Sequence, residues 1–336
     1  MRSIRLTVIE RRTAALAAQA AFAAAAVLTV LGPAAVRAAG YPNHPVRMVV
    51  PFPAGGSADL LTRIVAEKMA TRWGQPVVVE NRPGAAGNIG AELVYKAEPD
   101  GYTLLSTPAP VLAVNLSLYP HLSYDATQFV AITVIAAVPS VLLVHPSLPV
   151  DDIRGFIAYA RAHPGKLNYA SQGSGTTSHL TTELLKSMAG LDMTHVPYKG
   201  TAPAMADLIA GQVDVLFDNL GTSLPYIRSG KLRALAVGSV QRDPALPQVP
   251  AMDEVLPGFT SAAWFAIVAP PKTPPDIAAA VQSAVAEAER TPDVEEKLRE
   301  MAARPMAITP AETSAFFEQE RERWRKVIQQ AKVRVD

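Results

Sequence analysis

The sequence predicts an α/β fold in two lobes that are joined by two crossing strands. Short β-branched runs alternate with helical patterns along the chain, which is typical of α/β proteins with mainly parallel strands. Two extended apolar segments, 138–144 and 264–269, bracket a stretch long enough to form its own core. We therefore expect one lobe at 41–140 plus 266–336 and an inserted lobe at 141–265, with a ligand cleft between them.

The strands are expected where apolar runs end in loops rich in Gly, Pro, Asn or Ser. They are 46–51, 76–80, 102–106, 131–135, 141–145, 167–171, 194–197, 213–218, 233–238 and 264–269. Helical patterns lie between them, at 58–72, 87–97, 152–163, 178–189, 202–210 and 221–229. Three more helices follow, each with a Thr–Pro start at Thr273, Thr291 or Thr309, and Thr309 with Glu312 has the spacing of a capping box.

Residues 1–38 are expected to be a signal peptide that is cleaved after export. Four arginines open the segment, residues 13–31 are almost all apolar, and residues 36–38 place small side chains at a cleavage site. A retained membrane anchor is the alternative, because 19 apolar residues nearly span a bilayer. The Ala-rich composition and the interruption at Gln19 favour cleavage and a periplasmic protein. The export route, general secretory or twin-arginine, stays open.

Composition excludes several classes of function. Without residues 1–38, which hold five basic residues and one acidic residue, the chain keeps 26 basic and 29 acidic residues and a net charge of −3. This balance does not favour nucleic-acid binding. The absence of cysteine excludes disulfides, thiol nucleophiles and thiolate metal sites. The six histidines include no pair at metal-binding spacing and no Walker sequence occurs, so neither a metal nor a cofactor is expected.

The loop that follows the first expected strand is a candidate anion site. It is rich in Pro and Gly and leads directly into a helical pattern. Backbone N–H groups at such a helix start, at the positive end of the helix dipole, suit an anionic ligand. An ordinary tight turn is the alternative. The candidate binding residues in this loop are Phe52, Ala54, Gly55, Ser57 and Asp59.

A similar loop lies in the second expected lobe, where hydroxyls and glycines crowd the start of a helix and would seat a carboxylate. Its candidate binding residues are Ser171, Gly175, Thr176, Thr177 and His179. A purely structural histidine is the alternative for His179.

Three further candidates stand at the ends of other strands. Tyr198 and Lys199 lie in a loop that opens a helix, and Lys199 could neutralise an acid, although a solvated lysine is the alternative. Asp218 ends a strand at the edge where α/β proteins usually form their sites.

Taken together, these loops resemble the tripartite tricarboxylate transporter substrate-binding proteins, also called the Bug family. The matching segments are 51–59, 80–87, 169–180, 197–200, 207–208 and 211–214, and they span most of the chain in order. The resemblance implies a clamshell, type II-like periplasmic binding protein that is not an enzyme. Ala86 departs from the family pattern, which often has glycine there, and Thr176-Thr177 departs from its usual smaller residues.

The resemblance also implies a mechanism and partners. A monomeric receptor would close two lobes on a small carboxylate and deliver it to a membrane permease with one large and one small subunit. The loops of 52–59 and 171–179 would face the ligand from opposite lobes and hold it with backbone N–H groups, hydroxyls and bridging waters.

Two other functions are compatible with the sequence. The same fold could act as a ligand sensor for a membrane kinase, which the sequence does not distinguish from transport. A secreted α/β hydrolase would need an activated nucleophile. Ser174 and His179 are present, but Gly173-Ser174-Gly175 is not the G-x-S-x-G elbow of that class. The motifs do not identify the carboxylate.

Overall fold

Ten strands form one continuous sheet in the computed structural model, which describes residues 40–331 and 333. These residues belong to one compact unit that begins at Gly40. The predicted signal peptide and its alternative, a membrane anchor, lie outside the described residues. Among the described residues, no helix has both the length and the apolar character that crossing a membrane requires.

The sheet has the strand order β2-β1-β3-β9-β4-β7-β5-β6, and β8 and β10 also pair with β4. The strands are β1 (Val46–Val50), β2 (Val77–Asn81), β3 (Thr103–Pro108), β4 (Val130–Val144), β5 (Asn168–Ser171), β6 (Thr194–Pro197), β7 (Val215–Asn219), β8 (Arg233–Val237), β9 (Ala262–Ala269) and β10 (Arg304–Pro305).

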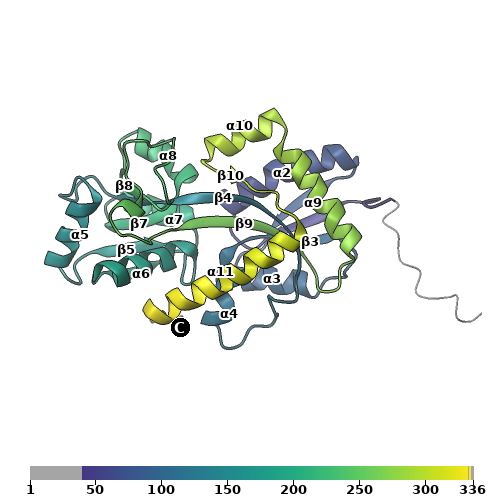
Figure 1. Cartoon of the computed structure of the whole chain (residues 1–336), viewed down its shortest axis with the longest axis horizontal. Coiled ribbons are helices and arrows are strands. Elements are labelled where there is room, and N and C mark those ends of the chain that lie inside the picture. Colours follow the sequence, from purple (N-terminus) through teal and green to yellow (C-terminus); the bar gives the residue numbers. More distant parts are fainter. Residues whose placement is uncertain (1–39, 332, 334–336) are drawn as a thin grey trace, which may run out of the picture. The chain divides into compact units, whose positions relative to one another are not determined.

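The long strand β4 joins two groups of strands. Residues 130–139 pair with β9, whereas residues 140–144 pair with β7. We call β1, β2, β3, β9, β10 and β4 up to Pro139 the first half-sheet, and the remaining strands with β4 from Ser140 the second half-sheet. In Figure 1, β4 and β9 run side by side across the middle of the molecule.

Two expectations about the strands need correction. Segments 131–135 and 141–145 were expected as separate strands, but they form the single strand β4. Pro139 lies where β4 changes partner, a place where a missing N–H group is tolerated. The expected parallel pairing holds within β1–β3 and within β5–β7, whereas every pair that β4 or β9 makes is antiparallel. The lobe boundaries at residues 140 and 265 stay a prediction.

Helices cover both half-sheets. They are α2 (Ser57–Trp73), α3 (Asn88–Tyr95), α4 (Asn115–Leu118), α5 (Ile153–Ala162), α6 (Thr177–Ala189), α7 (Thr201–Ile209), α8 (Leu220–Arg228), α9 (Pro275–Glu289), α10 (Pro292–Glu300) and α11 (Pro310–Ala331), with short turns at Ala85–Gly87, Pro110–Val114 and Met252–Glu254. The expected capping box of α11 is confirmed, because the N–H of Thr309 donates to the Glu312 carboxylate and the N–H of Glu312 to the Thr309 hydroxyl.

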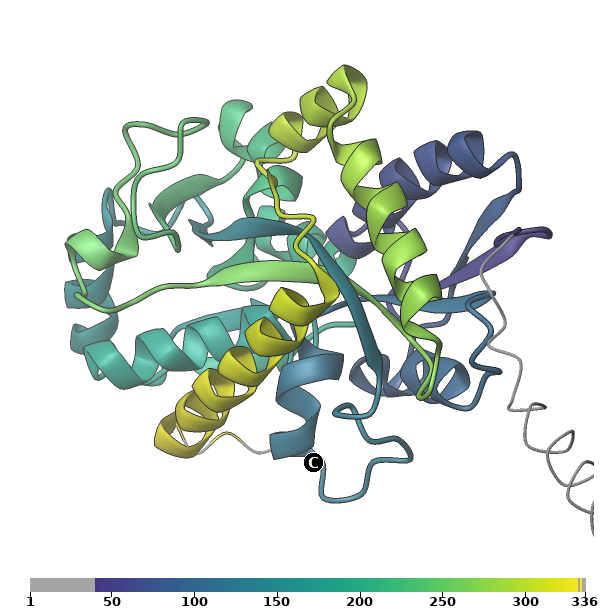
Figure 2. The same ribbon diagram turned by 45° about the vertical axis from the view of Figure 1, so that its right-hand side comes forward.

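Each half-sheet has a buried apolar cluster on either face. In β1, Met48 and Val50 face one cluster with α2 and α9, whereas Val49 faces another with α11, as the two-residue period of a strand requires. The second half-sheet separates its two clusters in the same way, with Leu142 on one side and Leu143 on the other. Figure 2 shows α11 lying diagonally across the molecule.

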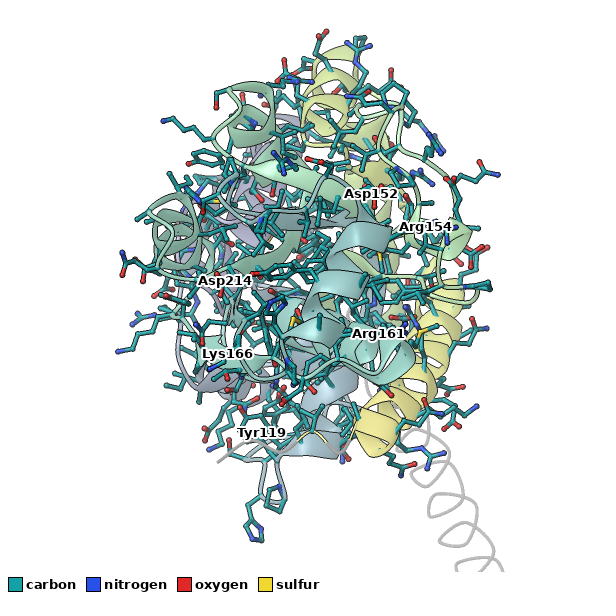
Figure 3. The ribbon with its side chains drawn as sticks, turned by 90° about the vertical axis from the view of Figure 1, so that its left-hand side faces the viewer. Tyr119, Asp152, Arg154, Arg161, Lys166 and Asp214 are labelled. Carbon is teal, nitrogen blue, oxygen red and sulfur yellow. The ribbon has the colours of Figure 1, made fainter. Side chains whose placement is uncertain are left out.

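The helix α5 closes the outer end of the second half-sheet. The Asp152 carboxylate caps its start by accepting the N–H of Gly155 at 2.7 Å. Near its end, the Arg161 side chain donates to the carbonyl of Ala189 in α6 at 2.8 Å. Figure 3 shows Asp152 and Arg161 at the two ends of this helix. Both contacts join segments of the second half-sheet, between residues 152 and 189.

Candidate functional site

A cavity of about 440 Å³ lies between the two half-sheets. This volume is in the range of small-molecule sites. The first half-sheet contributes the loop after β1, including Phe52 and Ser57, and the strand residue Phe265. The second contributes loops that follow β5, β6 and β7. The cavity thus sits at the carboxyl ends of parallel strands, where α/β proteins usually bind ligands.

Four helices begin at this cavity, which is its main electrostatic feature. The first residues of α2, α6, α7 and α8 line it or directly precede lining residues. The residues that precede these helices are Gly56, Thr176, Gly200 and Asn219, and only Thr176 uses its side chain as a cap. The first N–H groups of a helix have no partner within the helix. Three uncapped helix ends therefore present N–H groups and positive dipole ends to one space, which favours an anion.

The remaining wall is mostly apolar, with one cation at its edge. Phe52, Pro108, Phe265 and Tyr226 provide the apolar surface. Among the described residues that line the cavity, Lys199 alone carries a formal charge, and its side chain forms no ion pair with a described residue. The cavity therefore suits a ligand with an apolar body and negative ends.

The two half-sheets touch beside the cavity. Asn219 at the start of α8 donates from Nδ2 to the hydroxyl of Ser57 at 3.0 Å, and both residues are buried. Gly221 packs against the backbone of Met301 so closely that a Cβ atom on Gly221 would lie 2.1 Å from the Met301 carbonyl oxygen. These contacts join residues far apart in sequence, so they depend on how the half-sheets meet.

Of the thirteen candidate residues, seven line the cavity and six do not. The seven are Phe52, Ala54, Gly55, Ser57, Thr176, Thr177 and Lys199. The six that do not line it are Asp59, Ser171, Gly175, His179, Tyr198 and Asp218. That these residues contact a ligand stays a prediction, and the contacts of the second group show what they do in the fold.

Asp59 braces the first loop from behind. One carboxylate oxygen accepts the N–H of Gly55 at 2.9 Å, and the other accepts from Arg63 at 2.9 Å and from Asn81 at 3.0 Å. Asn81 also donates to the carbonyl of Phe52. Burial raises the pKa of Asp59, but the hydrogen bonds from Arg63, Gly55 and Asn81 outweigh it and leave the pKa below its ordinary value. The carboxylate is therefore ionised at neutral pH.

His179 and Ser171 brace the second loop in a comparable way. His179 Nδ1 accepts the N–H of Gly175 at 3.0 Å, and the Ser171 hydroxyl bonds His195 Nε2 at 2.7 Å. Burial, followed by the charges of His195 and Lys186, lowers the pKa of His179 to about 3. Because Nδ1 is an acceptor here, the neutral ring carries its proton on Nε2.

Asp218 and Tyr198 also act through their neighbours. The Asp218 carboxylate accepts from Gln172 at 2.5 Å and from Thr222 at 2.7 Å, and both of these donors line the cavity. Burial raises the pKa of Asp218, although these hydrogen bonds oppose the effect. The Tyr198 hydroxyl donates to Asp207 at 2.6 Å, and burial together with this bond raises the pKa of Tyr198 to about 12.

Several residues that line the cavity were not among the candidates predicted from the sequence. Pro108 and Phe265 oppose each other in the antiparallel pairing of β3 with β9, a contact between distant segments. Asn219 directly follows Asp218, and successive side chains of a strand point to opposite faces. This alternation was the signal that Asn219, and not Asp218, faces the cavity. Thr222 and Tyr226 lie four residues apart on α8 and share a helix face.

The geometry gives no support to a metal centre or a hydrolase. The described residues include no group of three His, Cys, Asp or Glu side chains that could hold a metal ion. His179, the base that a hydrolase would need beside Ser174, is buried, and its Nδ1 already accepts the Gly175 N–H. Among the described residues, the His179 imidazole therefore acts as a hydrogen-bond acceptor within the loop.

Comparison with known proteins decides the family. A model of the tripartite tricarboxylate transporter family receptor matches residues 61–333. This chain belongs to that family. The match covers most of the described residues, so the resemblance seen in the sequence motifs is confirmed.

Three solved structures of similar proteins show the fold of this family. The periplasmic binding protein BugD is 35% identical, with a TM-score of 0.82, and the match covers 88% of this chain and 99% of BugD. An R. palustris protein solved with adipate is 40% identical, with a TM-score of 0.84, and the match covers 88% of this chain and 99% of that one. MatC from Rhodopseudomonas palustris, solved with bound malate, is 34% identical with a TM-score of 0.81, covering 86% and 100%. This chain, as a member of the receptor family, therefore has the two-lobed fold of a periplasmic binding protein.

Proposed function

We propose that this receptor captures a small carboxylate in the periplasm by closing its lobes on the cavity, and that it delivers the acid to a membrane permease with one large and one small subunit. The observation that carries the proposal is the convergence of four helix N-termini on one cavity. Helix ends favour a negatively charged group. Closure follows if the acid contacts both half-sheets, because it then binds the closed state more tightly than the open one.

A dicarboxylate fits the cavity better than a monocarboxylate. One carboxylate would accept N–H groups at the helix ends, beside Ser57 and Thr177. The apolar wall at Phe52 and Phe265 would cover a short carbon chain, and Lys199 would pair with the second carboxylate. The similar proteins solved with adipate and malate support this choice, since both of those ligands are dicarboxylates.

Binding without chemistry is the expected outcome. The lining contains hydroxyls, amides and one lysine, and its described residues include no histidine or carboxylate that could act as a general base. A histidine or carboxylate base is the usual activator of a serine or threonine hydroxyl. The receptor should therefore release the acid unchanged.

Titration calorimetry on the purified protein, stripped of bound solute, tests the proposal. The panel contains adipate, malate, hexanoate and the neutral diamide of adipic acid. We expect heat and saturation with at least one diacid and none with the diamide. Binding of the diamide as tightly as adipate, or no binding by adipate, malate or hexanoate, would refute carboxylate capture.

A matched pair of lysine variants tests the place of the second carboxylate. Lys199→Met removes the cation at the cavity, whereas Lys166→Met removes an exposed lysine at the outer end of the second half-sheet (Figure 3). We expect Lys199→Met to weaken diacid binding about tenfold and hexanoate binding much less, because a charged hydrogen bond is lost. Lys166→Met should change neither. Equal losses for the diacid and hexanoate would place the second carboxylate elsewhere.

Delivery is tested separately, with the two permease subunits in membrane vesicles. Addition of the receptor loaded with its acid should produce uptake of labelled acid, and the acid without receptor should not enter. Capture of a membrane kinase by the loaded receptor, without any uptake, would support the sensor alternative.

A further inference from the structure

The two loops that face the cavity contain the same contact. In the first, the N–H of Gly55 donates to the Asp59 carboxylate at 2.9 Å; in the second, the N–H of Gly175 donates to His179 Nδ1 at 3.0 Å. In both loops the acceptor stands four residues after the glycine, in the first turn of α2 or α6. Both glycines have positive φ, +84° and +78°, a conformation that suits glycine.

Each acceptor is itself held by a second residue that also fixes the start of the loop. Asn81 donates to the Asp59 carboxylate and to the carbonyl of Phe52. In the other loop, the His179 ring stacks on the His195 ring with centroids 4.0 Å apart, and His195 bonds the hydroxyl of Ser171. The two pairs, Asp59 with Asn81 and His179 with His195, thus fix their loops in the same way with different chemical groups.

Each contact uses one backbone N–H group inside its own loop. The N–H groups of Gly55 and Gly175 are used inside the loops, and Asp59 and His179 are buried behind them. The next residues, such as Ser57 and Thr177, line the cavity as first helical residues. A helix does not satisfy its first N–H groups. The loop conformation therefore uses the two glycine N–H groups internally and leaves the first N–H groups of each helix for a ligand.

We propose that Asp59 and His179 are paired positioning residues, each of which presets one binding loop before a solute arrives by accepting the N–H of the glycine four residues earlier. Their role in binding rests on the proposed function, but the presetting itself does not need a ligand. His179 can serve only as a neutral imidazole. The groups that face it are Tyr169 from β5, His195 from β6 and Lys186 from α6, and Glu183 from α6 faces the stacked His195.

Hydrogen exchange at the two glycine amides tests the presetting in protein without ligand. Selective ¹⁵N-glycine labelling resolves Gly55 and Gly175. Asp59→Ala should speed exchange at Gly55 about tenfold and leave Gly175 unchanged, and His179→Phe should do the reverse while keeping a ring against His195. Asp59→Asn keeps the size of the side chain but only one oxygen acceptor, for which Gly55 competes with Arg63 and Asn81. It should therefore restore only part of the protection at Gly55.

Two outcomes would overturn the proposal. One is unchanged exchange at the matched glycine. The other is equal acceleration at Gly55, Gly175 and the buried amide of Gly238, which would mark general destabilisation. Asp59→Asn, which keeps the size of the side chain, guards against a variant that simply fails to fold. The ¹⁵N shift of His179 Nδ1 in the wild-type protein is an independent check, and a protonated Nδ1 would also overturn the proposal.

Adipate serves as the binding probe and separates this proposal from the proposed function. If both hold, Asp59→Ala and His179→Phe weaken adipate binding about tenfold, and Asp59→Asn recovers part of the loss. If the exchange rates respond as expected but no carboxylate binds the wild-type protein, the proposed function fails and the presetting stands. If adipate binds but the exchange rates do not respond, the presetting fails alone.

Discussion

The imidazole rings of His179 and His195 lie parallel, with centroids 4.0 Å apart and planes inclined by 4°. Tyr169 extends the stack, with its ring centroid 4.8 Å from that of His195. Burial lowers the pKa of His179 to about 3 and that of His195 to about 4, and the nearby Lys186 adds to both shifts. Glu183 opposes the shift at His195. The folded protein therefore keeps both rings neutral at pH values where a free imidazole is charged.

The first prediction concerns stability in acid. The folded pKa values of both histidines lie below the ordinary value of 6.5, so the unfolded state binds more protons as pH falls. The free energy of unfolding should fall as pH drops from about 6.5 to about 3 for His179, by up to about 1.4 kcal/mol per pH unit, and from about 6.5 to about 4 for His195. The effect is smaller for His195, which is partly exposed.

Urea unfolding at pH 7.5, 6.5, 5.5 and 4.5 measures this slope. Other groups also titrate in this range, so the comparison is with His179→Phe, which lacks one of the two titrations. The slope of the variant should be shallower than that of the wild type. Identical slopes between pH 6.5 and 4.5 would show that His179 is not kept neutral by the fold.

The second prediction concerns Gly221. Its Cβ position lies 2.1 Å from the carbonyl oxygen of Met301, a backbone atom that cannot move aside as a side chain can. Gly221→Ala should lower the free energy of unfolding by about 1–3 kcal/mol, as expected for overpacking. Gly155→Ala is the matched control, because that helical glycine meets only Asp152, at 3.5 Å. Its stability should change by less than about 1 kcal/mol, and in the favourable direction. Equal stability of the two variants would contradict the close approach.

The third prediction concerns the hydrogen bond from Asn219 to Ser57, which joins the half-sheets. A double-mutant cycle of Ser57→Ala and Asn219→Ala should show a coupling of about 0.5–1.5 kcal/mol in the free energy of unfolding without ligand. A control cycle pairs Asn219→Ala with Ser314→Ala, an exposed residue of α11. That cycle should be additive. Additivity in both cycles would mean that the half-sheets do not hold this contact in solution.

The fourth prediction concerns Glu289 at the end of α9. Its side chain is buried, its Oε1 atom has no hydrogen-bond partner among the described residues, and burial raises its pKa to about 8. The folded state therefore binds more protons here than the unfolded state, whose ordinary value is 4.5. The free energy of unfolding should fall as pH rises from about 4.5 to about 8, by roughly 1.4 kcal/mol per pH unit at most.

Glu289→Gln removes this titration and keeps the shape of the side chain. The variant should be more stable than the wild type at pH 8 and close to it at pH 5, as measured by urea unfolding at both values. The exposed Glu318→Gln serves as the control and should track the wild type. A stability difference that is the same at both pH values would exclude a buried titrating carboxylate.

Local patterns predicted much of the candidate site because its loops follow strands directly. Ser57, Thr177 and Lys199 line the cavity for this reason. Phe265 could not be found in this way, since it reaches the cavity only through the pairing of β9 with β3. The sequence also did not distinguish a residue at the cavity from one directly behind it. Asp59 has the chemistry of a ligand contact, yet its oxygens are occupied by Gly55, Arg63 and Asn81, and only the folded loop determines that.

The uncapped starts of α2, α7 and α8 have an evolutionary consequence. Their donors are backbone amides, which nearly every substitution leaves in place, so an anchor for a negative group would persist while the sequence drifts. The wall at Phe52, Pro108, Phe265 and Tyr226 consists of side chains, and these change one at a time. A new cargo would then require only a few substitutions in that wall, and receptors with an identical anchor could diverge to acids of different length and shape.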